Sequence, residues 1–116
     1  MHCICWPRDS KPHAQAKPKA YVISEVTVID PVGLKSYAER AGPLIKQHGG
    51  TFLVRNEKGT AIDGDAPKQY TIYVFDSLEA EQAWQNDPAV KALLVERRKY
   101  ATFRAFVVEG RSSLPQ

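Results

Sequence analysis

The chain has 116 residues, 43% hydrophobic and 25% charged, which is typical of a single soluble globular domain. Its formal net charge of +3 arises in residues 1–19, which hold four of the 16 basic residues but only one of the 13 acidic residues. The rest is balanced and no apolar run could cross a membrane, so we expect neither a nucleic-acid partner nor a membrane.

Residues 1–19 are expected to form a disordered N-terminal tail, because three prolines interrupt them and they show no apolar periodicity. No apolar segment of a secretory signal follows the charges, so we expect a cytoplasmic protein. Cys3 and Cys5 lie in this tail. With His2 and a distant His13 they make a poor set for structural zinc, which usually needs four ligands at suitable spacing. We therefore interpret them as exposed thiols and expect no metal.

The folded domain is predicted to span residues 20–110, with a C-terminal tail at 111–116. Residues 20–28 are β-branched and aromatic, which predicts a strand. Asp30-Pro31 then provides an N-cap and a first-turn proline for a helix with an apolar face. We expect Gly42-Pro43 to kink or break this helix and His48-Gly49 to end it.

A second strand, residues 51–56, follows this helix at once. After a turn, residues 60–62 are expected to form a short strand extension, followed by a loop. Residues 69–75 alternate β-branched and aromatic side chains and give the clearest strand of the chain.

Ser77 is expected to cap a second helix that begins with an acidic turn. Asn86-Asp87-Pro88 should end that helix and cap a third, whose apolar residues run from Val90 to Ala101. Residues 102–109 form the last predicted strand.

The order of these elements is β-α-β-β-α-β, the split βαβ arrangement. The predicted fold class is therefore α+β and ferredoxin-like, with helices covering one face of a four-stranded antiparallel sheet. Both faces of the strands are largely apolar: Ile72 and Val74 oppose Tyr73, and Phe106 and Val108 oppose Val107. Because helices cover only one face, we expect a second copy of the chain to cover the other, giving a homodimer.

Several segments resemble the small bacterial family DUF1330, which belongs to the dimeric α+β barrel group. The resemblance covers nearly the whole folded part, in the same order. The matching segments are Ala20–Ile23, His48–Arg55, Phe75–Ala80, Ala83-Trp84 with Pro88 soon after, and Val107–Gly110. The resemblance implies a ferredoxin-like fold that forms a dimeric α+β barrel. It implies no established reaction, because the surrounding group includes cofactor-free oxygenases, isomerase-like enzymes and proteins without known activity.

His48 is the candidate catalytic residue, because an imidazole with a pKa near about 6.5 can act as acid or base at neutral pH. The alternative is a histidine that interacts with the dipole at a helix C-terminus. Arg55 is either a solvent-exposed strand residue or a ligand-binding group. Arg97 projects from an apolar helix stripe, where it would form an ion pair with Glu25 or another acid, or clamp an anionic ligand.

Tyr37 and Trp84 lie on helix faces directed at the sheet and are either core residues or the walls of a pocket. With His48, Arg55 and Arg97 they would form an apolar site with a few polar groups. We therefore expect a site for a small organic molecule, anionic or aromatic, without metal or other cofactor. The alternative is a non-catalytic dimeric interaction or structural module, and the residues do not distinguish an enzyme from a binding protein.

Overall fold

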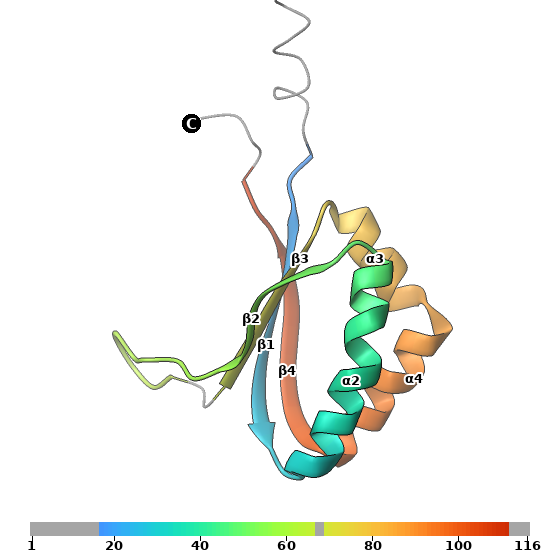
Figure 1. Ribbon diagram of the computed structural model, residues 1–116. Helices are drawn as coiled ribbons and strands as arrows, with labels where there is room; N and C mark the ends of the chain where they lie inside the picture. The colour runs from blue at the N-terminus through green and yellow to red at the C-terminus, as the bar shows by residue number, and fades with distance from the viewer. Residues whose placement is uncertain (1–16, 67–68, 112–116) are drawn as a thin grey trace, which may run out of the picture.

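The computed structural model describes residues 17–66 and 69–111 and contains a four-stranded antiparallel sheet with helices on one side (Figure 1). The elements in chain order are β1 (Ala20–Val28), α2 (Pro31–Gln47), β2 (Thr51–Glu57), β3 (Gln69–Phe75), α3 (Leu78–Asn86), α4 (Pro88–Glu96), a 3₁₀ turn η1 (Arg97–Lys99) and β4 (Ala101–Glu109). The predicted α+β, ferredoxin-like fold class is confirmed.

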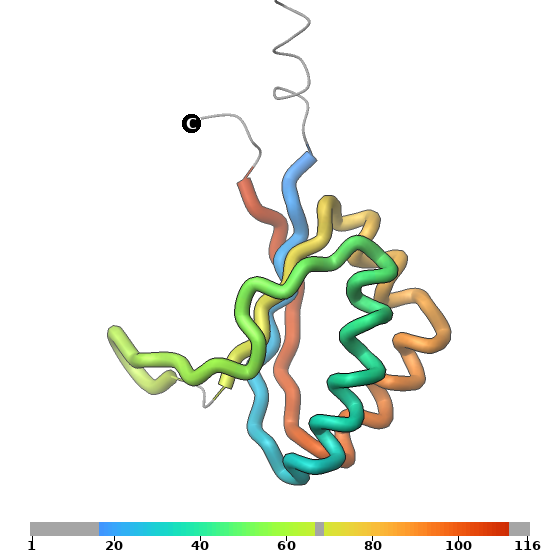
Figure 2. Tube along the Cα trace, in the orientation of Figure 1, coloured from blue at the N-terminus to red at the C-terminus, as the bar shows by residue number. Residues whose placement is uncertain are grey.

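The strand order in the sheet is β2-β3-β1-β4, so β1 and β3 form the centre and β2 and β4 the edges. Figure 2 follows the chain through this order and shows α2, α3 and α4 on the same side of the sheet. The connection from β2 to β3 projects away from the helices (Figure 1). The described residues therefore build two layers and place no helix on the other face of the sheet.

The helix ends follow the predicted capping chemistry. Asp30 Oδ1 accepts the backbone N–H of Gly33, and the Ser77 and Asp87 side chains accept N–H groups in the first turns of α3 and α4. At the other end of α2, Gly49 has φ +86° and donates its N–H to the Lys46 carbonyl. This left-handed glycine turns the chain directly into β2.

Three local predictions differ from the structure. The break that Gly42-Pro43 could have caused does not occur, and a single helix runs through Pro43, because apolar residues on both sides of it hold the helix on the sheet. Residues 60–62 form no strand, since the chain there leaves the sheet. The third helix ends at Glu96, and Ala101 is the first residue of β4.

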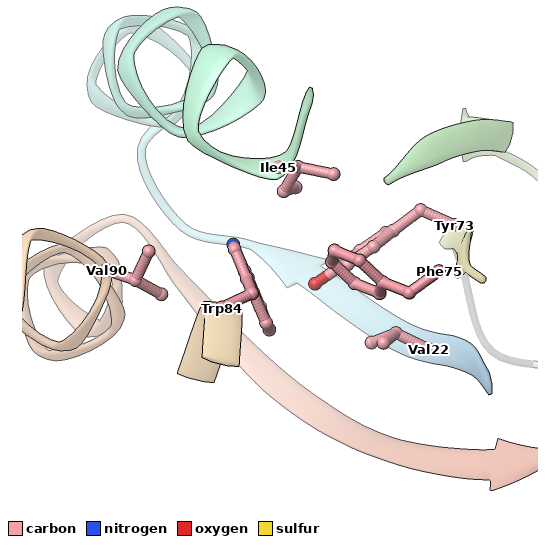
Figure 3. Packing of buried hydrophobic residues seen from close by; sticks show 6 residues of the cluster. All are labelled: Val22, Ile45, Tyr73, Phe75, Trp84 and Val90. Carbon is pink, nitrogen blue, oxygen red and sulfur yellow. The ribbon is translucent and has the colours of Figure 1, made fainter. Parts of the chain in front are cut away.

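The core forms where α3 and α4 meet the sheet around Trp84. The Trp84 ring lies between Val90 and the rings of Tyr73 and Phe75 (Figure 3). Its centroid is 5.5 Å from that of Tyr73 and 5.6 Å from that of Phe75. Such aromatic pairs add to the free energy gained by burying their area. Trp84 thus fixes the position of α3 against the sheet.

The face of the sheet without helices is apolar, as the strand pattern predicted. Ile23 in β1 pairs with Ile72 on one side and with Phe106 on the other, whereas its neighbour Val22 packs under the helices. Phe106 and Val108 are 43% and 44% exposed on this open face. An apolar area of this kind usually marks an interaction surface.

Some predictions fall outside the described residues. The expected N-terminal tail at 1–19 is described only from Lys17 onward, and the C-terminal tail at 111–116 only at Arg111. The proposed thiols Cys3 and Cys5 lie in the part that is not described. Within the described part, no helix has both the length and the apolar character to cross a membrane.

Replacing Pro43 with alanine is expected to stabilise the domain. Pro43 is exposed inside α2 and leaves the helix without one backbone donor. Interior proline costs a helix about 3 kcal/mol, of which about 1 kcal/mol is offset by the stiffer unfolded chain. Urea unfolding of Pro43→Ala should therefore give a free energy of unfolding about 1 to 2 kcal/mol higher. The exposed Lys46→Ala is the control, and a lower value for Pro43→Ala would contradict the argument.

Candidate functional site

A cavity of about 60 Å³ lies between α2 and the sheet, and we call it the arginine cavity because two arginines line it. Its apolar lining includes Leu34, Ile45 and Phe52. The polar and aromatic residues around it come from six different elements: Ser24 (β1), Tyr37 (α2), Arg55 and Asn56 (β2), Thr71 and Tyr73 (β3), Arg97 (η1) and Phe103 (β4).

Arg55 reaches the cavity because β2 contains an extra residue. Phe52 pairs with Tyr73 and Val54 pairs with Ile72, so two steps along β2 match one step along β3. Such a bulge reverses the alternation of side chains that follow it. Arg55 therefore lies on the same face as Phe52, and its Cζ atom is 4.4 Å from the centroid of that ring. Simple alternation along β2, without the extra residue, would place the two on opposite faces.

Arg97 lines the same cavity from a different element. It begins η1, directly after the last residue of α4, and its Cζ atom lies 4.2 Å from the Phe103 ring centroid. The cation thus rests on an aromatic face. The alternative of an ion pair with Glu25 is wrong, because Glu25 pairs with Arg104, at 3.6 Å, on the open face.

The arginine cavity is positively charged. Its lining contains no acid, and no carboxylate among the described residues lies within 4.0 Å of the charged nitrogens of Arg55 or Arg97. Glu96 precedes Arg97 in the chain but is bound by Arg40 and by the Tyr100 hydroxyl, at 2.8 Å. Two cations line this small volume without an internal counter-ion.

Ser24 lies at the centre of the sheet and was not identified by sequence reasoning. Its side chain is buried at 3% exposure, and Oγ has no hydrogen-bond partner in the described structure. The neighbouring Thr71 Oγ1 accepts the N–H of Asn56 and donates to the Asn56 side chain. A buried hydroxyl without a partner costs free energy, so Ser24 offers a bond to anything that enters. The one available signal was a polar residue on the face of β1 that otherwise carries Ala20, Val22 and Val26.

Two tyrosines add neutral donors. Burial raises the pKa of Tyr37 above its usual value, and the nearby Arg97 charge lowers it in part. Burial also strongly raises the pKa of Tyr73. Both phenols therefore keep their protons at neutral pH and can donate hydrogen bonds.

His48 and Trp84 do not line the arginine cavity. His48 Nε2 lies 2.9 Å from Asp87 Oδ2, so the histidine connects the end of α2 with the junction of α3 and α4. Trp84 belongs to the core cluster with Tyr73 and Phe75. Of the five predicted site residues, the structure brings Tyr37, Arg55 and Arg97 together. The hypothesis that His48 shares this cavity and acts there as a base is wrong.

The bond between Arg40 and Glu96 is expected to make the domain sensitive to acid. Hydrogen bonds from Arg40 and Tyr100 lower the pKa of Glu96 from 4.5 to about 2. A depressed carboxyl pKa stabilises the fold above the unfolded value, and this stabilisation is lost as the pH falls from about 4.5 to about 2. Thermal melts should show a steeper loss of Tm over this range in the wild type than in Glu96→Gln. Parallel curves would contradict the contribution of Glu96.

The family of the chain is shown by its sequence. Residues 19–111 match the family described as "Domain of unknown function (DUF1330)", and the chain belongs to this family. No curated protein matches the chain.

Solved structures share the fold at low sequence identity. The RPA0582 protein of unknown function from Rhodopseudomonas palustris is 13% identical, with a TM-score of 0.65, over 94% of this chain and 95% of that one. SnoaB, a cofactor-independent oxygenase from Streptomyces nogalater, is 19% identical, with a TM-score of 0.60, over 85% and 99%. A dimeric protein of unknown function and ferredoxin-like fold from Bacteroides fragilis is 15% identical, with a TM-score of 0.51, over 78% and 95%. These likenesses establish the fold alone.

Proposed function

We propose that this DUF1330 protein binds a small organic carboxylate in the arginine cavity. The observation that carries the proposal is the pair Arg55 and Arg97, which line one cavity that contains no acid. Guanidinium groups bind carboxylates through paired, charge-assisted hydrogen bonds. The unpartnered hydroxyl of Ser24 and the neutral phenol of Tyr37 add donors around the same volume.

The size of the cavity limits the part of the ligand that it encloses. About 60 Å³ is well below the roughly 150 Å³ of an apolar cavity that takes benzene. The carboxylate head would therefore be enclosed, while an apolar or aromatic body extends toward the mouth. Arg55 and Asn56 are exposed, which places that mouth beside β2. The Phe52 ring beneath Arg55 would contact the body of the ligand.

The lining favours binding over acid–base catalysis. Neither histidine nor cysteine nor a carboxylate is among the residues that line the cavity, and the two tyrosines hold their protons. A general base works best with a pKa near the working pH. The likeness to an oxygenase named as cofactor-independent is consistent with a small-molecule site without a cofactor, and that activity belongs to the relative.

Benzoate is expected to raise the Tm of the wild-type protein in a thermal-shift experiment, whereas methyl benzoate is not. A ligand at 100 times its Kd stabilises the native state by about 2.7 kcal/mol. Arg97→Gln should weaken benzoate binding about tenfold or more, because it removes a charge-assisted bond. Arg55→Gln should weaken it too, with part of the loss compensated by solvent at the mouth.

The control is Arg98→Gln, which removes an exposed arginine from the same turn. Its benzoate affinity should equal that of the wild type. If a broad set of small acids gives no shift, or if Arg97→Gln binds benzoate as the wild type does, the proposal fails. The first of these outcomes would favour the alternative of a non-catalytic interaction module.

We also propose that the open face of the sheet joins two copies of the chain. The exposed Phe106 and Val108 on this face, together with the dimeric relative from Bacteroides fragilis, support a homodimer. Light scattering should give twice the 13.0-kDa chain mass at micromolar concentration, and Phe106→Asp should shift it toward the monomer. Val95→Asp, at an exposed valine on α4, is the control and should remain dimeric. A monomeric wild type would refute this proposal.

A further inference from the structure

A second recess, of about 140 Å³, lies on the β4 side of the core, and we call it the Glu81 recess. Its wall combines the polar groups of Tyr73, Glu81, Gln85 and Arg97 with apolar side chains, among them Val22, Trp84, Leu94 and Val107. Its volume approaches the roughly 150 Å³ of an apolar cavity that holds one benzene molecule. The recess is therefore large enough for one small ring.

The carboxyl group of Glu81 is the unusual feature of this wall. Glu81 is only 1% exposed, although its neighbours Glu79 and Gln82 on α3 are exposed. Its Oε2 atom accepts a hydrogen bond from the Gln85 side chain, one helical turn later. Its Oε1 atom is buried and has no partner in the described part of the structure. Burial raises the pKa of this carboxyl above its usual value.

This arrangement reduces the stability of the fold. A buried polar atom without a hydrogen bond loses its hydration without compensation, and a carboxyl group loses more than a neutral group. An apolar residue of the same size would fill this position at lower cost. Structural packing alone therefore gives no reason for a glutamate here, whereas a bound molecule that supplies the missing hydrogen bond does.

We propose that the Glu81 recess is a binding site for a small uncharged molecule with a hydroxyl donor on an apolar body, a phenol being the simplest example. The hydroxyl would donate to Oε1 of Glu81, and the ring would pack against Trp84 and Leu94. An oxygen of a carboxyl group accepts a hydrogen bond whether the group is ionised or protonated. The proposed bond therefore does not depend on the charge of Glu81.

This site is separate from the proposed carboxylate site, although Tyr73 and Arg97 line both. Arg55 lines the arginine cavity but not the Glu81 recess. Glu81 lines the recess but not the arginine cavity. The two proposals can therefore fail independently. Arg55→Gln should leave phenol binding unchanged, and a change at Glu81 should leave benzoate binding unchanged.

The test is an NMR titration of the wild-type protein with phenol, followed at the indole N–H of Trp84, with toluene as the ligand that lacks the donor. Glu81→Met keeps the size of the side chain and removes the acceptor. We expect it to weaken phenol binding about tenfold, to leave toluene binding undiminished, and to raise the Tm. Glu81→Gln retains an acceptor oxygen and should bind phenol within about threefold of the wild type.

The matched control is Gln82→Met, the same kind of replacement at an exposed position next along α3. Gln82→Met should leave the phenol affinity unchanged. It should also not raise the Tm as Glu81→Met does. Failure of phenol to shift the Trp84 signal up to its solubility limit would overturn the proposal. An equal loss of phenol and toluene affinity in Glu81→Met would do so as well. A Tm lowered by Glu81→Met would show that the carboxyl group serves the fold rather than a ligand.

Discussion

The proposed carboxylate site depends on one extra residue in β2. In a sheet covered by helices on one face only, each side chain faces either the helices or the open side, and alternation decides which. The bulge between Phe52 and Val54 reverses that alternation and places Arg55 with the helices. Without it the arginine cavity would have one cation, Arg97, and the charge of Arg55 would lie on the apolar open face. Bulges occur often beside functional sites for this reason, because they redirect a side chain without changing the fold.

The fold could be predicted because its signals are local and agree with one another. The caps at Asp30, Ser77 and Asp87 and the glycine at position 49 set the helix ends, and alternating strands set the faces. The sequence left open a break at Pro43, which does not occur, because contacts with the sheet outweigh the local cost of proline. Those contacts join residues far apart in the sequence and leave no local pattern.

The site could be predicted only in part, for the same physical reason. Arg97 was identified because an arginine on an apolar stripe needs a partner, and its partner is an aromatic ring rather than an acid. The prediction for His48 was wrong because a histidine at a helix end can equally well bond with the capping residue of another helix. Here it bonds with Asp87, the N-cap of α4. Ser24 and Glu81 were missed because burial and the absence of a partner are properties of the folded chain. No spacing in the sequence shows that a polar atom lacks a bond.

The distribution of satisfied and unsatisfied polar groups is itself an argument about function. Away from the two cavities, several charged groups form ion pairs, among them Arg40 with Glu96, His48 with Asp87 and Arg104 with Glu25. Around Tyr73, by contrast, two arginines lack acids and two buried oxygens, on Ser24 and Glu81, lack hydrogen bonds. Each of the two buried oxygens without a hydrogen bond lowers stability, and each could be removed by a single apolar replacement. Such departures gather where a protein retains groups for a ligand instead of for its fold. Their concentration on both sides of one tyrosine therefore supports the proposed sites between the helices and the sheet.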